Sequence, residues 1–119
     1  MAVATAVFCA AVPVLTMRFT ATADAAATDF TTTRALRVFD ATAIKTAALG
    51  NAGDTVQVLN AANAITNAIA LNAADATVVR AGTINDANNR IAAAGTLRIT
   101  TVEGGVNCAC ELYIHCVPA

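Results

Sequence analysis

Charged and aromatic residues are scarce in this chain of 119 residues. Charged side chains make up 13% and aromatic ones 4%, and tryptophan is absent, whereas an average globular domain carries roughly 25% charged residues. With a formal net charge of −1, neither sign dominates enough to indicate a nucleic acid or a membrane as partner. The shortage of aromatic residues argues against a roomy ligand pocket, and we expect no cofactor.

Small apolar residues take the place of the missing charges. Hydrophobic residues make up 57% of the chain, and alanine, threonine and valine dominate. The length fits one domain with no room for a second large core. Because few charges remain to cover the outside, we expect part of the surface to be buried against another protein.

The first 17 residues carry no charge at all. A secretory signal would place Lys or Arg ahead of its apolar run, and Pro13 interrupts any continuous helix, including a membrane span. We therefore predict that residues 1–33 form an extended N-terminal arm and linker that contacts other molecules. Folding back as an edge strand of its own domain is the alternative. The predicted protein interface consists of the arm's larger apolar residues: Val3, Val7, Phe8, Val12, Val14 and Leu15.

Residues 34–119 show the alternation of short β-strands. In residues 55–59, Val56 and Val58 alternate with polar residues, and residues 96–102 follow the same pattern. Residues 64–71 are ambiguous, because Ile65 and Ile69 stand four apart as on a helix, but their turn-rich flanks favour a strand. The pattern predicts an all-β domain, an antiparallel β-sandwich of jelly-roll type. The remaining expected strands are 34–45, 77–81 and 107–117.

Three of the four cysteines lie near the C-terminus. Cys108, Cys110 and Cys116 share parity with Leu112 and Ile114, so on a strand all five side chains point to one face. Free cysteine behaves as a small hydrophobic residue. We therefore predict buried, reduced thiols that fill the core.

Two other interpretations of the cysteines remain open. One is a disulfide that involves Cys9. The other is a metal site with Cys108, Cys110 and His115 as ligands. His115 has the opposite parity and would point away from those thiols in a regular strand, so we expect no metal site.

His115 forms a polar stripe with Glu111 and Tyr113 on the other face of the same strand. General acid–base chemistry would require a nucleophile and an orienting group within reach. The sequence contains no nucleophile motif such as G-x-S-x-G. We therefore expect a surface or interface stripe and no enzymatic activity.

Four segments carry a resemblance to a known class of protein. They read GDTVQV at 53–58, NAITNAI at 63–69, VRAGTINDA at 79–87 and IAAAGTLRIT at 91–100. The cadence resembles small virion proteins of tailed bacteriophages, of the head decoration or cement type. The resemblance implies a compact β domain on the capsid surface, made in the host cytoplasm, which commonly trimerises. It implies no catalytic residues.

The expected function is therefore that of an accessory capsid protein. It would bind the major capsid protein and its own copies, and would stabilise the shell by burying apolar surface and adding strands across interfaces. A phage fibre, tail or neck component is one alternative. A secreted β-sandwich binding module, for example one that recognises carbohydrate, is the other.

Overall fold

The computed structural model describes residues 14–21, 26–46, 53–102 and 109–119, and these residues form an all-β structure. No helix among them is long and apolar enough to cross a membrane. The strands are β1 (Leu15–Ala21), β2 (Ala26–Thr31), β3 (Leu36–Lys45), β4 (Thr55–Asn60), β5 (Asn63–Ala64), β6 (Ile69–Ala70), β7 (Val78–Arg80), β8 (Arg90–Ile91), β9 (Thr96–Val102) and β10 (Cys110–Pro118).

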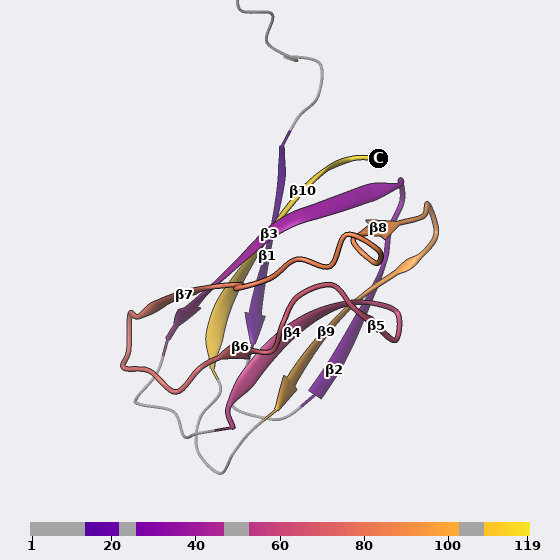
Figure 1. Cartoon of the computed structure of the whole chain (residues 1–119). Helices are drawn as coiled ribbons and strands as arrows, with labels where there is room; N and C mark the ends of the chain where they lie inside the picture. The colour runs from indigo at the N-terminus through magenta and orange to yellow at the C-terminus, as the bar shows by residue number, and fades with distance from the viewer. Residues whose placement is uncertain (1–13, 22–25, 47–52, 103–108) are drawn as a thin grey trace, which may run out of the picture.

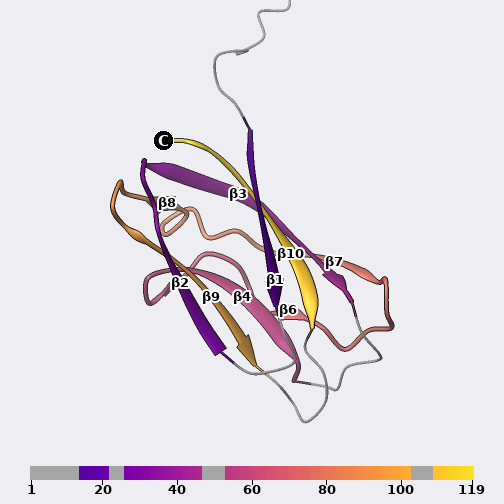
Figure 2. The same cartoon turned by 180° about the vertical axis from the view of Figure 1, so that it is seen from behind.

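The strands form two antiparallel sheets packed face to face (Figures 1 and 2). The first sheet has the order β1-β10-β3-β7, with β8 also paired to β3, and the second has the order β2-β9-β4-β5, with β6 also paired to β4. In chain order, β1 pairs with β10, β2 with β9, β3 with β7 and β8, and β4 with β5 and β6. The first half of the chain thus pairs with the second half as one long antiparallel ribbon, and this ribbon folds across both sheets. This is the jelly-roll arrangement of a β-sandwich, so the predicted fold class is confirmed.

Alternation along the central strands builds the core. Val56 and Val58 on β4, and Leu97 and Ile99 on β9, are buried between the sheets. Polar residues between them face outward, as the sequence pattern predicts. Because most inward side chains are aliphatic or small, the two sheets can pack closely, and Phe19 and Phe30 add aromatic packing beside β1 and β2.

A β-bulge on β3 changes the parity of that strand. His115 pairs with Asp40 while Cys116 pairs with Val38, so Phe39 has no partner residue on β10. Val38 and Ala41 consequently both face the core, although they are three residues apart. The regular alternation expected for residues 34–45 therefore holds only on each side of the bulge.

The predicted boundary between an arm of residues 1–33 and a domain of residues 34–119 is wrong. β1 pairs along its full length with β10, and β2 pairs along its full length with β9. Met17 and Phe19 on β1, like Phe30 on β2, pack against the core. β1 and β2 therefore belong to the sandwich, because their alternating apolar residues complete the inner faces of both sheets.

The prediction of a single strand at residues 64–71 is also wrong. The structure has the two short strands β5 and β6 there, both paired with β4. Between them, the hydroxyl of Thr66 accepts a hydrogen bond from the Val58 N–H at 3.1 Å, and the Gln57 side chain donates to the Thr66 carbonyl at 2.9 Å. Side-chain groups thus take over part of the ladder at this point, while the Val58 carbonyl still accepts a hydrogen bond from the Ile65 N–H at 2.9 Å.

Candidate interaction edge

One side of the sandwich ends in two long, regular strands, β1 and β2, and we call it the open edge. They are consecutive in the chain but lie in different sheets. Among the described strands, β1 pairs only with β10 and β2 pairs only with β9. A row of backbone N–H and C=O groups on each of them therefore faces outward, which is the template that a further strand requires.

The hydrogen-bond pattern identifies these outward groups on β2. The Thr32 N–H donates to the Gly95 carbonyl at 3.0 Å, directly beyond the Thr31–Thr96 pair. Because bonding alternates along an antiparallel strand, even-numbered residues of β2 bond to β9. The N–H and C=O groups of Ala27, Asp29 and Thr31 face away from it.

The same argument applies to β1. The Thr46 N–H donates to the Ala109 carbonyl at 3.2 Å, one position beyond the Lys45–Cys110 pair, so odd-numbered residues of β10 bond to β3. Even-numbered residues of β10 then bond to β1, and their partners on β1 are its odd-numbered residues. The outward backbone groups on β1 are therefore those of Thr16, Arg18 and Thr20.

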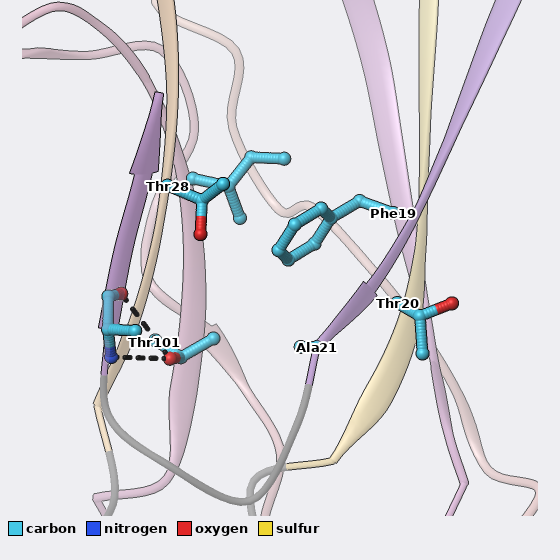
Figure 3. Close-up of a pocket in the computed structure, with 7 residues that line it drawn as sticks. Phe19, Thr20, Ala21, Thr28 and Thr101 are labelled. Carbon is cyan, nitrogen blue, oxygen red and sulfur yellow. Dashed lines mark hydrogen bonds between the residues drawn. The ribbon is translucent and has the colours of Figure 1, made fainter. Parts of the chain in front are cut away.

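A cavity of about 220 Å³ opens between the two sheets at this edge. Phe19 on β1 points into it from one side and Thr28 on β2 lies across from it (Figure 3). Ile99 and Thr101 on β9 also line it. Side chains thus leave part of the space between the two sheets empty at the open edge, between β1 and β2.

Two contacts hold the strands beside the cavity. The Thr101 hydroxyl accepts a hydrogen bond from the Ala26 N–H at 3.0 Å and lies 3.4 Å from the Ala26 carbonyl (Figure 3). Phe19 and Phe30 meet edge to face, with ring centroids 5.8 Å apart. The strands of the open edge are therefore fixed in place even though the space between them is not filled.

The opposite side, which we call the closed edge, is joined by asparagine side chains. The Asn60 amide donates to the carbonyls of Asn88 and Arg90 at 3.1 and 2.8 Å, and the Asn88 amide donates to Ala64 at 3.0 Å. The Asn89 amide donates to the Val38 carbonyl of the other sheet, also at 3.0 Å. These bonds link the two sheets through residues 88–90, so this edge offers no comparable free strand among the described residues.

Each strand of the open edge carries one charge at its centre. Arg18 on β1 lies 3.3 Å from the Glu111 carboxylate. Asp29 on β2 accepts two hydrogen bonds from the Arg98 guanidinium, at 2.7 and 3.0 Å. These bonds from Arg98 hold the pKa of the Asp29 carboxyl below its usual value. Asp29 therefore stays ionised at neutral pH.

The predicted polar stripe is present on the outer face of the first sheet. Tyr113 donates to Glu111 at 2.8 Å, and the His115 ring nitrogen Nδ1 lies 3.2 Å from the Thr16 hydroxyl. Asp40 is the neighbour of His115 on β3, which brings a hydroxyl, an imidazole and a carboxylate into one row.

This row lacks the bonding of a catalytic relay. Arg80 binds both carboxylate oxygens of Asp40, at 3.1 and 2.9 Å, and the Ala41 N–H donates to the same carboxylate. Partial burial raises the pKa of Asp40, but the hydrogen bonds from Arg80 and Ala41 outweigh it and lower the pKa overall. The carboxylate is thus committed to Arg80 on a face that is separate from the cavity.

The described cysteines behave as the sequence predicts. Cys110 and Cys116 are buried on the inner face with Leu112 and Ile114, and burial raises the pKa of Cys116 to about 11. His115 lies on the other face of β10, away from these thiols. Cys9 and Cys108 lie outside the described residues.

The predicted interface residues fall into two groups. Val3, Val7, Phe8 and Val12 lie outside the described residues. Val14 is 60% exposed, directly before β1, whereas Leu15 begins β1 and packs against the core of its own domain. Sequence reasoning missed the open edge itself, because it placed residues 15–31 in the arm and linker. The alternation of Leu15, Met17 and Phe19 was the signal that could have revealed β1.

The chain was compared with protein families, curated proteins and solved structures. No family model matches the chain, no curated protein matches it, and no solved structure matches it.

Proposed function

We propose that this chain is a structural, non-enzymatic module that works by binding copies of itself and a larger protein assembly. The observation that carries the proposal is the open edge, with its two long strands and their outward backbone groups. Adding strands to a free sheet edge is a common means of joining protein chains. The low charge of the chain supports the same conclusion.

The resemblance of four segments to small virion proteins supports a role for this module in a phage particle. In the proposal it is an accessory capsid protein of decoration or cement type, bound to the major capsid protein on the phage head. Jelly-roll sandwiches occur in capsid proteins and in lectin domains alike, so the fold is compatible with this role and does not decide it.

The test is the composition of the natural particles. Phage particles that carry the gene are purified on a density gradient, and the chain is quantified by mass spectrometry and located by immunogold labelling. The proposal expects a copy number comparable to that of the major capsid protein, with label on the head. Label confined to the tail or neck would favour the fibre, tail or neck role. Absence from the particles, together with binding to carbohydrate, would favour a secreted binding module.

A further inference from the structure

The open edge has the features of an interface between two copies of this chain. We propose that two copies join edge to edge about a twofold axis parallel to the strands. In this dimer, β1 of each copy pairs antiparallel with β2 of the other, which joins the sheets of the two copies into two continuous sheets. The inference rests on the proposed self-association and names the surface that carries it.

The charges at the edge select this pairing. A β1–β1 pair centred on Arg18 would place two arginines opposite each other, and a β2–β2 pair centred on Asp29 would place two aspartates there. Like charges directly opposite each other are unfavourable in a sheet. Pairing β1 with β2 places Arg18 opposite Asp29 of the second copy. Charges of alternating sign then follow one another across the joined sheet, from Glu111 through Arg18 to Asp29 and Arg98 of the second copy.

The backbone groups match in the same register. With Arg18 opposite Asp29, Thr16 lies opposite Thr31 and Thr20 lies opposite Ala27. In all three pairs both residues present outward N–H and C=O groups, as the ladders on β9 and β10 require. These pairs would therefore all be hydrogen-bonded.

The geometry of one copy allows both pairings at once. Phe19 and Ala21 of β1 line the same cavity as Thr28 and Ala26 of β2, so the C-terminal half of β1 and the N-terminal half of β2 lie at the same end of the open edge. The arrows of β1 and β2 point in opposite directions (Figure 3). A twofold axis parallel to them brings each β1 beside β2 of the second copy, antiparallel and in one register.

The dimer also accounts for the cavity. Inward side chains on the new strand pairs become neighbours, with Phe19 of one copy next to Thr28 of the other. The two cavities face each other across the axis and become enclosed. Water is thereby removed from apolar surface that the single copy leaves accessible.

Engineered disulfides test the register. In the full chain with Cys9 and Cys108 replaced by Ser, Thr16→Cys combined with Thr31→Cys places two thiols opposite each other between copies. The Cα atoms of a hydrogen-bonded pair are about 5.5 Å apart, which suits a disulfide. Within one chain the two positions lie on different sheets. We expect a disulfide-linked dimer on mild oxidation.

Three controls make the result specific. Thr20→Cys with Thr31→Cys shifts the register by four residues, roughly 13 Å, and should give no linked dimer. Thr16→Cys alone should give none either. Ala27→Pro removes only an outward N–H and should weaken the dimer about a hundredfold by sedimentation.

Four outcomes would overturn the inference. One is equal cross-linking of the in-register and shifted pairs. The second is no cross-linking of the in-register pair while the chain still sediments as an oligomer, which leaves the proposed function standing. The third is cross-linking that appears only after deletion of residues 1–13, which would show that the N-terminal segment covers the edge. The last is a monomer at all concentrations, which would contradict self-association itself.

Discussion

The two edges of this sandwich solve the same problem in opposite ways. Every sheet ends in strands whose outer backbone groups lack a ladder partner. At the closed edge the strands are short, and the amides of Asn60, Asn88 and Asn89 supply hydrogen bonds that a longer strand would otherwise make. At the open edge β1 and β2 run for seven and six residues, and no described element covers them.

The difference separates what stabilises the fold from what is available for binding. A side-chain amide that bonds across two sheets fixes their relative position and uses the backbone groups that another chain would need. A regular strand with one central charge keeps its backbone groups available and restricts which strand can pair with it. The closed edge therefore serves the single chain, and we infer that the open edge serves an assembly.

The largest effect is expected from proline on β2, where neighbouring residues face opposite ways. Thr28→Pro removes an N–H that bonds to β9 and should lower the free energy of unfolding by about 3 kcal/mol. Ala27→Pro removes an outward N–H and should cost about 1 kcal/mol or less. Urea denaturation of both variants at low protein concentration measures the difference. Equal losses would mean that the assignment of outward groups is wrong.

At the closed edge, Asn89→Ala should be the most costly amide substitution. It removes the donor to the Val38 carbonyl, and Val38 is fully buried, so that carbonyl loses a bond that water cannot readily replace. We expect a loss of about 2 kcal/mol in thermal or urea unfolding. Asn85→Ala is the matched control, since its amide oxygen accepts only a local bond from Ala87 on the surface, and about 0.5 kcal/mol is expected. A control loss as large as that of Asn89→Ala would contradict a bridging role.

A larger side chain should stabilise the fold where it fills the cavity at the open edge, and should destabilise the fold where the core is already packed. Ala21→Ile adds carbon atoms where the cavity has room and should raise the free energy of unfolding by about 1 kcal/mol. Ala43→Ile makes the same change in a fully buried position on β3, where overpacking should cost about 2 kcal/mol. Calorimetry of the two variants compares them directly. A loss in both would indicate that the space beside Ala21 is already filled in solution.

The smallest expected effects come from the turn between β8 and β9. Ala94 has a φ of 61°, a conformation in which alanine is strained and glycine is not, so Ala94→Gly should gain about 0.5 kcal/mol. At the next position, a Cβ on Gly95 would meet the Ala92 carbonyl oxygen at 2.8 Å, so Gly95→Ala should destabilise by about 1 kcal/mol. Opposite signs at adjacent positions, measured by thermal unfolding, check the turn geometry. The same sign for both would contradict it.

Much of the fold could be predicted from the sequence because it depends on alternation. Residues 96–102 form the predicted strand, and the parity of Cys110, Leu112, Ile114 and Cys116 placed them correctly in the core. The bulge at Phe39 could not be predicted, since it depends on the register with β10 rather than on the local pattern.

The open edge could not be predicted from the local sequence for a related reason. Thr16, Arg18 and Thr20 have no distinctive motif, and their significance comes from the strand that lies on the other side of β1. Residues 15–31 were assigned to an arm and linker because the linker-like run at 21–33 contains many threonines and aspartates. Their long-range pairing with β9 and β10 overrides that local tendency.

Amide hydrogen exchange, resolved by residue and measured across a range of protein concentrations, shows directly whether the open edge joins two copies. If the open edge joins two copies, the amides of Thr16, Arg18, Thr20, Ala27, Asp29 and Thr31 become protected as concentration rises. The alternate residues, which already bond within the chain, should change little. Free exchange of these six amides at concentrations where the chain is associated would rule out the edge-to-edge dimer, because the copies would then be joined through another surface.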